Sequence, residues 1–373
     1  MQIKTIDKGR RHRRELWIDE ETQVAHLWVI DYPMRMGHAE VRMAGIGDVY
    51  TEREHRMKGY MRHLYEDTVA YMTDEGYDVS MLFGIPDFYT KFGYATCLPK
   101  YQFTIKTRDA EAARADARSY TSRPIEADDM PAVLALYNRQ NASRTGTIIR
   151  DPEEFEAFEK GSDWGKRAET ALWESARGDL LGYAVWDRNK TAVKVAEFGA
   201  QSAELYGTLL YTFAQQAVEK RCETITFYVP LDHEFAEYAQ RFGTRWSIEY
   251  PRHSDGMMRI LNQQPLFEKL VPLFERRLTN PQVAGMQGVL TIETDLASTA
   301  LMFSSGKVRV VPGEAEPVHL SLSQDKLMQM LMGYRSVSDV LTATDVSASE
   351  HALPLLNVLF PKGAPFVWPP DYF

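Results

Sequence analysis

The amino-acid sequence predicts a mixed α/β protein made of three consecutive units. Short β-type runs and longer runs with helical spacing follow one another in a similar order twice, first before and then after about residue 109. After about residue 262 the order changes, because a helical run now precedes a new set of β-type runs. The length of 373 residues points the same way, since one hydrophobic core rarely organises a chain of that size.

Composition and charge narrow the class of partner. With 44% hydrophobic and 12% aromatic residues, the chain has ample material for packed cores. The formal net charge of −9 argues against a general nucleic-acid-binding role and is compatible with a cationic small-molecule substrate. We therefore expect no nucleic-acid partner.

Cysteine usage and hydropathy bear on compartment and metal binding. Cys97 and Cys222 lie far apart, without a CxxC or Cys/His cluster, so the sequence predicts neither a disulfide framework nor a metal site. A reducing, cytoplasmic setting is the default expectation. No run of about 18 apolar residues occurs, which predicts no membrane-spanning segment and no membrane partner. The basic run from Lys8 to Arg14 fits either a solvated strand entrance or a contact with an acidic partner.

The first unit, predicted at residues 1–108, consists of strands and one long helix. Strands are expected at residues 16–18, 24–30, 41–49, 79–83 and 101–105, with a turn at 33–38 and a short helix at 88–92. From Tyr60 the apolar side chains repeat at helical spacing, and Gly76 is expected to end this helix. Residues 109–122 are predicted to be an exposed linker, because their first part is rich in alanine and charge.

The second unit, predicted at residues 123–261, repeats this order. Helices are expected from Asp128 or Asp129, with Pro131 in the first turn, and at 203–219, and strands are expected at 170–174, 180–186, 193–198 and 224–229. A short echo that follows a strand in each unit supports duplication. The two stretches are Pro86 with Tyr89-x-x-Phe92-Gly93, and Pro230 with Tyr238-x-x-x-Phe242-Gly243.

The third unit, predicted at residues 262–373, begins with an amphipathic helix at 266–278. Strands are expected at 288–294, 300–303, 308–311 and 318–322, and later helices around 328–332 and at 351–360. The first of these later helices contains Met328, Met330 and Met332. Methionines of this kind either fill an ordinary core or line a lipid-sized cavity.

One turn of the first unit has the composition of a phosphate-binding site. A strand ends at Val49-Tyr50-Thr51, and Arg56-Met57-Lys58-Gly59-Tyr60-Met61 then opens the long helix. Backbone N–H groups at a helix N-terminus are unpaired and carry the positive end of the helix dipole, so they bind phosphates directly. Gly59 permits a close approach of the backbone, and Arg56, Lys58 and Arg62 add positive charge.

The turn and the segment after the next strand resemble the GNAT superfamily of N-acetyltransferases. The signature of that superfamily is Arg or Gln-x-x-Gly-x-Gly or Ala, and the chain has Arg56-x-x-Gly59 but departs from it at Met61. The resemblance implies that acetyl-CoA is bound by Val49, Tyr50, Thr51, Arg56, Met57, Lys58, Gly59, Tyr60, Met61 and Arg62. It also implies that Tyr89, which Gly93 and Tyr94 follow, is a general acid; the alternative is a core aromatic residue.

Over its whole length the chain resembles the enhanced intracellular survival (Eis) proteins, which acetylate amines. That family combines a catalytic GNAT domain, a second GNAT-like domain and a sterol-carrier-protein-like α/β domain. Residues 200–204 of the second unit lack Arg-x-x-Gly and include Glu204, so this unit is expected to be structural. The resemblance further implies a homo-oligomer, and a terminal carboxylate at Phe373 that acts as base; a merely packed tail is the alternative.

One departure and two rival functions stay open. The leading strand and helices of a GNAT domain are expected to be missing. Either the acceptor groove is open, or a partner subunit completes it, or the chain starts later than its relatives do. The expected acceptor is a primary amine of a small cationic molecule or a lysine side chain. The rivals are a lipid- or sterol-binding protein that uses the third unit, and a non-catalytic oligomeric scaffold.

Overall fold

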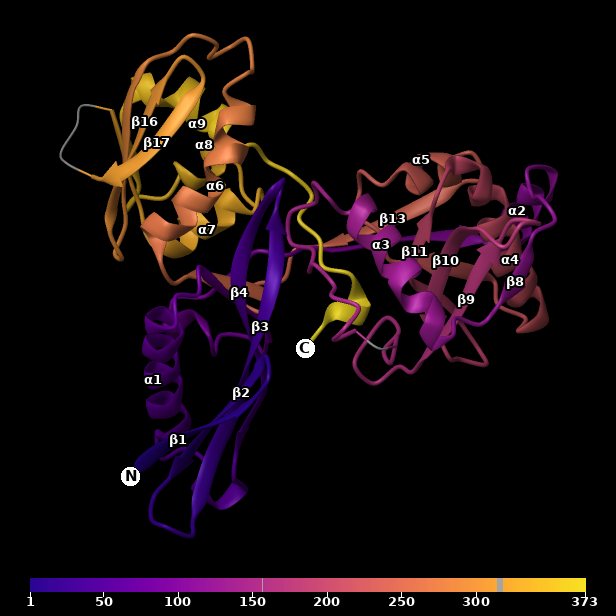
Figure 1. Cartoon of the computed structure of the whole chain (residues 1–373), viewed down its shortest axis with the longest axis horizontal. Helices are drawn as coiled ribbons and strands as arrows, with labels where there is room; N and C mark the ends of the chain where they lie inside the picture. The colour runs from indigo at the N-terminus through magenta and orange to yellow at the C-terminus, as the bar shows by residue number, and fades with distance from the viewer. Residues whose placement is uncertain (156, 314–317) are drawn as a thin grey trace.

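The computed structural model describes residues 1–155, 157–313 and 318–373. The strands form three mixed sheets, with helices packed against them, and Figure 1 shows the corresponding three bodies. This arrangement confirms the predicted mixed α/β fold class. Within the described residues, no helix is both long and apolar enough to cross a membrane.

The first sheet carries a long helix on one face. Its strands, in spatial order, are β1 (Gln2–Lys8), β2 (Arg11–Trp17), β3 (Gln23–Met36), β4 (Ala39–Thr51), β5 (Val79–Gly84), β14 (Asp255–Ile260) and β6 (Ala95–Thr96). Strands β4 and β5 are parallel, and the other neighbours are antiparallel. Helix α1 (Tyr60–Asp74) connects β4 to β5 and packs through Leu64 and Tyr65 onto the face that carries Leu27 and Ile46.

Strand β1 corrects the expectation that a leading strand is missing. β1 and β2 form an antiparallel hairpin through a turn at Gly9 and Arg10, and no helix separates them. The basic run therefore lies largely in this hairpin. Within it, Arg13 pairs with Glu15 at 3.0 Å and Arg14 pairs with Asp67 of α1, which favours the strand interpretation over a contact with an acidic partner.

The second sheet has helices on both faces. Its strands, in spatial order, are β13 (Thr244–Glu249), β7 (Lys100–Lys106), β12 (Thr224–Phe227), β11 (Val193–Ala200), β10 (Leu180–Asp187), β9 (Ala168–Glu174) and β8 (Thr121–Arg123). Helix α3 (Met130–Gln140) lies over the face of β11 at Gly199, where Gln140 is a neighbour together with Tyr183. Helix α4 (Tyr206–Glu219) packs on the other face with Phe198 and Phe227.

The two sheets share one strand order, but each takes one strand from the other unit. The order β1-β2-β3-β4-β5-β14-β6 corresponds to β8-β9-β10-β11-β12-β7-β13, with the parallel pair at the same place. The strand expected at residues 101–105 in the first unit pairs instead with β12 and β13 in the second sheet. In return, β14 pairs with β5 and β6. The boundaries 1–108, 109–122, 123–261 and 262–373 stay predictions. Each of the first two sheets contains strands from both sides of the predicted linker at 109–122.

The hairpin of β3 and β4 is longer than predicted. The expected turn at residues 33–38 is wrong, because β3 continues to Met36 and the hairpin turns at Gly37 and His38. Pro33 is tolerated inside β3, since its missing N–H faces away from β4. On that side the Pro33 carbonyl accepts a hydrogen bond from Ile149 N at 2.8 Å.

The expected exposed linker also differs from the structure. Residues 107–115 form α2 (Thr107–Ala110) and a 3₁₀ helix (Glu111–Ala115), in which Ala110 and Ala113 are buried. The buried alanines pack into the core of the second unit against α4. The predicted exposed linker is therefore wrong over residues 109–115, because the small side chains allow close helix packing there.

The third unit begins with α6 (Gln263–Arg277) and contains a five-stranded sheet. The strands and later helices are β17 (Lys307–Pro312), β16 (Ser298–Ser304), β15 (Gly288–Glu293), β18 (His319–Ser321), β19 (Ser347–Ala348), α7 (Gln324–Leu331), α8 (Val337–Val340) and α9 (Leu353–Leu359). Met328, Met330 and Met332 are buried in its core, which continues onto Met34 and Met43 of the first sheet. The methionines thus fill an ordinary core, which is one of the two interpretations of the sequence.

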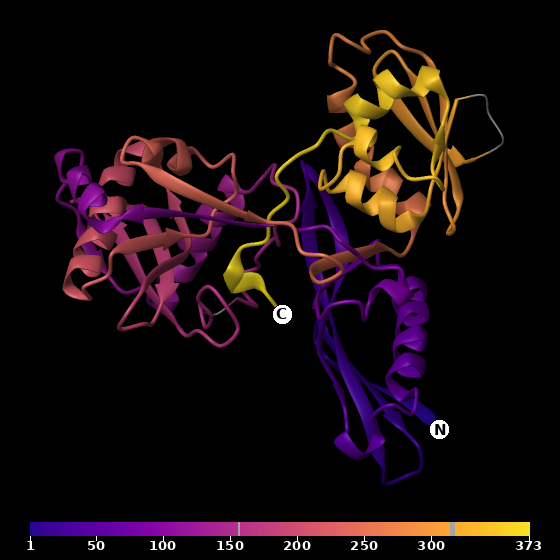
Figure 2. The same ribbon diagram turned by 180° about the vertical axis from the view of Figure 1, so that it is seen from behind.

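The chain leaves the third unit after α9 and runs back between the first two units (Figure 2). A short 3₁₀ helix (Pro369–Asp371) lies in this C-terminal segment, against β11 of the second sheet. The last residue, Phe373, reaches β4 of the first sheet. This path brings the end of the sequence to the unit where the sequence analysis places the chemistry.

Candidate active site

The basic turn is built by two residues in left-handed conformations. Met57 has a φ of 62° and Gly59 a φ of 82°. A Cβ on Gly59 would meet nothing within 4 Å, so the glycine is required by its conformation and not by lack of space. Arg56 turns back so that its Nε donates to the Thr51 carbonyl at 3.1 Å, which ties the turn to the end of β4.

The N-terminus of α1 is free to bind an anion. Gly59 is its N-cap and supplies no side-chain cap, and the first turn of the helix contains no acidic residue. The basic residues Arg56, Lys58 and Arg62 are all exposed around this end. Unpaired N–H groups, the helix dipole and the basic side chains therefore all favour a negatively charged ligand.

A cavity of ≈ 670 Å³ opens beside this helix end. It is lined by Val49, Tyr50, Thr51, His55, Arg56, Met57, Gly59, Tyr60, Met61, Arg62, Ile85, Phe88, Tyr89 and Lys91. Met57 is 102% exposed and Ile85 64% exposed, so the mouth of the cavity also offers apolar surface. Exposed apolar side chains around a basic cavity fit a ligand that has both phosphates and uncharged parts.

The edge of β4 that faces the cavity is unpaired over its last residues. Strands β4 and β5 pair only from Met43 to Ile46 and from Val79 to Leu82, after which the two strands diverge. Beyond that point β4 pairs with β3 alone, and the register between them shifts next to Asp48, which has a φ of 48°. The free edge of β4 can therefore accept an extended ligand as an added strand.

Tyr89 lies at the other wall of this cavity. Its ring packs over Gly84 at the end of β5, where a Cβ would come within 2.6 Å of it, and only 8% of the residue is exposed. Tyr65 and Phe88 surround it at ring distances of 5.6 and 4.9 Å. Burial, and then the neighbouring Tyr94, raise the pKa of Tyr89 to about 12, so its hydroxyl stays protonated at neutral pH.

Phe373 lies on the face of the first sheet opposite α1. Its ring stacks on Tyr32 at 5.2 Å and meets Phe83 edge-on at 5.4 Å. A Cβ on Gly45 would come within 2.9 Å of the Phe373 ring, and a Cβ on Gly47 would lie 3.4 Å from the Phe373 carbonyl carbon. The alternate glycines of β4 therefore make room for this residue, whose backbone carboxyl sits where β4 and β5 begin to diverge.

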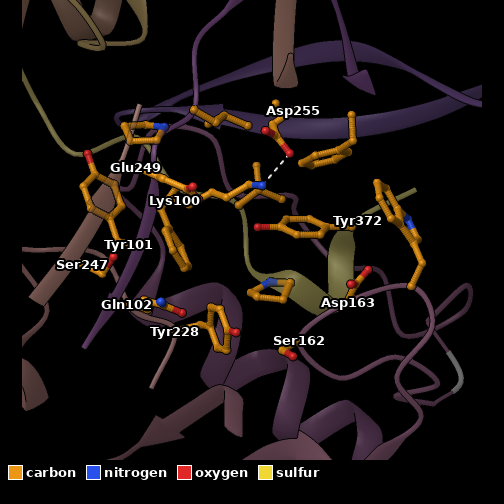
Figure 3. Close-up of a pocket in the computed structure, with 18 residues that line it drawn as sticks. Lys100, Tyr101, Gln102, Ser162, Asp163, Tyr228, Ser247, Glu249, Asp255 and Tyr372 are labelled. Carbon is orange, nitrogen blue, oxygen red and sulfur yellow. Dashed lines mark ion pairs between the residues drawn. The ribbon is translucent and has the colours of Figure 1, made fainter. Parts of the chain in front are cut away.

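A second cavity, of ≈ 370 Å³, lies between the first two units and borders the C-terminal segment (Figure 3). Its lining includes the aromatic residues Phe83, Tyr101, Trp164, Tyr228, Phe366 and Tyr372. Asp255 pairs with Lys100 at 2.6 Å, but none of the ion pairs of the described residues involves Asp163 or Glu249. Aromatic faces with an excess of carboxylates suit a cationic ligand.

The structure brings most of the predicted site residues together. All residues predicted to bind acetyl-CoA are described, and Lys58 is the one that does not line the cavity. Its side chain is exposed to solvent. Tyr89 lines the same cavity, whereas Phe373 lies on the opposite face of the sheet. Gly45 and Gly47, which lie against Phe373, are not among the predicted site residues. Glycines at alternate positions of one strand are a signal of close backbone approach.

Two stretches of the chain match known domain families. Residues 6–97 match the acetyltransferase (GNAT) domain, and residues 291–368 match the sterol carrier protein domain. No curated protein matches the chain in sequence. The order of the two domains agrees with the resemblance inferred from the sequence, which is thereby confirmed.

Solved structures of similar architecture align over nearly the whole chain. A GCN5-related N-acetyltransferase from Anabaena variabilis has a TM-score of 0.74 at 17% identity and covers 98% of this chain and 90% of its own. One from Kribbella flavida has a TM-score of 0.72 at 19% identity, covering 98% and 88%. Eis1 from Mycobacterium abscessus has a TM-score of 0.65 at 18% identity, covering 99% and 92%. At these identities the likeness is one of fold.

Proposed function

We propose that the chain, an acyltransferase with a GNAT acetyltransferase domain and a C-terminal sterol carrier protein domain, acetylates amines. The donor is acetyl-CoA, which the GNAT fold uses, and the acceptor is a primary amine of a small cationic molecule or a lysine side chain. The observation that carries this proposal is the uncapped, acid-free N-terminus of α1, which opens into a cavity lined by the predicted donor-site residues.

The donor site is assigned from the geometry of this cavity. The N–H groups at Gly59, Tyr60 and Met61 hold the pyrophosphate, and Arg56 and Arg62 add charge. The free edge of β4 at Val49–Thr51 pairs with the amide groups of the pantetheine arm, as an added strand does. Lys58 contributes through its charge from the exposed side of the turn.

The chemistry needs one proton acceptor and one proton donor. The backbone carboxyl of Phe373 takes the proton of the amine, directly or through water, as the nitrogen–carbon bond forms. A backbone N–H near Tyr50 stabilises the negative charge on the carbonyl oxygen. Tyr89 gives its proton to the sulfur as the carbon–sulfur bond breaks. Its pKa, raised to about 12, keeps the hydroxyl protonated at neutral pH, so that Tyr89 can hydrogen-bond to the developing thiolate and supply its proton.

The acceptor site is assigned to the cavity between the first two units. Phe83 and Tyr372 line it, and the Phe83 ring contacts both the Tyr372 ring at 4.3 Å and the Phe373 ring at 5.4 Å. Asp163 and Glu249 attract a positively charged amine, and the aromatic walls cover its apolar part. The first unit has no helices between β1 and β2 that could form walls for an acceptor. The second unit thus supplies these walls. A homo-oligomer stays an expectation that sedimentation measurements test.

Titration with acetyl-CoA tests the donor site. The wild-type chain is expected to bind it, and Arg56→Ala combined with Gly59→Asp is expected to weaken binding about 100-fold, since charge is removed and a carboxylate is placed at the phosphate. Because a side chain is strained at the left-handed φ of Gly59, Arg56→Ala alone is measured as well, and it is expected to weaken binding in the same direction but less. Glu204→Gln, at the corresponding turn of the second unit, is the control.

The outcomes separate the proposal from its rivals. A lipid-binding protein or a scaffold has no affinity for acetyl-CoA, and affinity unchanged in the double variant would also refute the donor site. Thiol release is then measured with polyamines, aminoglycosides and lysine peptides. Binding of acetyl-CoA without thiol release from any amine would refute the proposed acceptor class and leave the donor site standing.

A further inference from the structure

A buried ion network joins the C-terminal segment to the second unit. Arg150 donates through Nε to Asp371 Oδ1 at 2.7 Å, and through Nη1 and Nη2 to the carboxylate oxygens of Glu197 in β11 at 2.7 and 2.6 Å. The hydroxyl of Tyr137 in α3 donates to Asp371, and that of Tyr183 in β10 donates to Glu197. The side chains of Arg150, Glu197 and Asp371 are 1%, 0% and 4% exposed.

Every carboxylate oxygen in this network has a donor. Asp371 Oδ1 accepts from Arg150 and Asp371 Oδ2 from Tyr137, while both oxygens of Glu197 accept from Arg150. Buried charges persist only when they are paired and hydrogen-bonded in this way. Because each bond has a direction, the network fixes the position and the orientation of Asp371 more strictly than apolar contact does.

Two further bonds hold the segment on both sides of Asp371. Trp368 donates through Nε1 to Asn141 Oδ1 at 3.0 Å, and Lys160 donates through Nζ to the carbonyl of Tyr372 at 2.8 Å. Asn141 and Lys160 both belong to the second unit. Among the described residues, the side-chain hydrogen bonds that hold residues 368–373 therefore come from that unit.

The segment meets the first unit through aromatic contacts. Tyr372 packs on Phe83 at a ring distance of 4.3 Å, and Phe373 stacks on Tyr32 above Gly45. Such contacts tolerate sliding more readily than a saturated ion network does. Chain ends are also poorly ordered unless they are tied down. The placing of Tyr372 and Phe373 thus depends on the anchor at Asp371.

We propose that Arg150 is a positioning residue for acyl transfer. Through Asp371 it sets Tyr372 as a wall of the acceptor cavity and Phe373 at the point where β4 and β5 diverge. The second unit, which is expected to be structural, thereby completes the active site of the first. This inference rests on the proposed amine acetylation, and it adds to it a role for a residue of the other unit.

The variant Asp371→Ala tests the anchor with little effect on the second unit, because Arg150 keeps its pair with Glu197. We expect kcat to fall about 100-fold, as for a reacting group displaced by about 1 Å, and KM for the amine to rise. The dissociation constant for acetyl-CoA is expected to stay unchanged. Asp371→Asn keeps the size of the side chain and is expected to lose less activity.

The control is Asp345→Ala, which removes an exposed ion pair with Lys326 in the third unit and is expected to leave all three constants unchanged. Wild-type kcat in Asp371→Ala and Asp371→Asn would overturn the positioning role. A loss of acetyl-CoA affinity in step with kcat would also overturn it, because it would indicate a general loss of structure.

A second measurement does not depend on catalysis. Carboxypeptidase digestion followed by mass spectrometry is expected to remove Phe373 and Tyr372 from Asp371→Ala at least about 10-fold faster than from the wild-type chain. Equal digestion rates would overturn the anchor even if no amine is acetylated. A chain with one glycine added after Phe373 separates the two proposals. Full turnover in that chain refutes the carboxyl of Phe373 as base but leaves the anchor at Asp371 intact.

Discussion

The first and second sheets have the same strand order, yet the turns that precede their long helices differ in conformation and charge. At the start of α1, Gly59 provides a left-handed turn and the first helical turn has no acidic residue. At the corresponding place in the second unit, Glu204 lies in the first turn of a 3₁₀ helix and pairs with Arg118 at 2.6 Å. The negative charge of Glu204 near this helix end disfavours a phosphate there.

The opposite faces of the two sheets differ as well. In the second unit, α3 between β8 and β9 covers the face of β11 at Gly199. In the first unit, β1 and β2 join directly, and Phe373 lies over Gly45 and Gly47 on the corresponding face of β4. The same fold can therefore bind a ligand where the N–H groups of a helix end stay unpaired and no helix covers the sheet face. Where a carboxylate lies at the helix end and a helix covers the sheet face, as in the second unit, the fold serves as a support.

The largest expected effect contrasts the two tyrosines of the sequence echo. Tyr89→Phe is expected to lower kcat about 100-fold with unchanged acetyl-CoA affinity, because the proton donor to the leaving sulfur is lost. Tyr238→Phe is the matched control, since that hydroxyl donates to Asp116 at 3.1 Å on the surface of the second unit. Steady-state kinetics and calorimetric titration measure the two constants. Full turnover in Tyr89→Phe would refute Tyr89 as the proton donor and favour its role as a core aromatic residue.

A smaller effect on kcat is expected when one methyl group is added to β4 at Gly45, and the same change in β11 at Gly199 is the comparison. Gly45→Ala places a Cβ within 2.9 Å of the Phe373 ring, which is expected to shift the C-terminal segment and lower kcat about 10-fold with little change in melting temperature. Gly199→Ala places a Cβ within 2.5 Å of the Tyr183 ring inside a packed core. It is expected to cost about 1–3 kcal/mol of stability. The assignment of the two faces fails if Gly45→Ala lowers stability and leaves kcat unchanged.

The sequence predicts the donor site better than it predicts the arrangement of the units. The turn from Arg56 to Met61 is contiguous, and its strand and helix follow from local periodicity, so most of its residues meet in one cavity. The exchange of β7 and β14 is not predictable in this way, because an alternating pattern indicates a half-buried strand without naming its sheet.

Buried polar partners are the second limit of the sequence analysis. Arg150 bonds to residues 47 and 221 positions away, and nothing in its neighbourhood distinguishes it from an exposed arginine. The alternate glycines of β4 do carry a readable signal of close approach. The cytoplasmic setting and the homo-oligomer stay predictions.

The smallest expected effect concerns acid stability where the C-terminal segment meets the second unit. His233 caps α5 (Glu234–Gln240) by accepting a bond from Phe235 N at 3.2 Å, and its ring packs against Trp368 at 6.0 Å. Burial, and then Arg144, lower the pKa of His233 to about 3. The unfolded chain therefore binds this proton more readily, and stability that is present above a pH of about 6.5 is lost as the pH falls toward 3.

His233→Asn keeps a cap acceptor and removes the titration. Between pH 8 and pH 6 the wild-type chain is expected to lose about 0.8 kcal/mol more than this variant, as measured by thermal unfolding at both pH values. The first sheet offers the contrast, because its contacts with the segment, Tyr32 and Phe83, carry no charge that changes in this range. Acid is therefore expected to loosen the segment first at Trp368. Equal pH dependence in both proteins would show that His233 is not the titrating group.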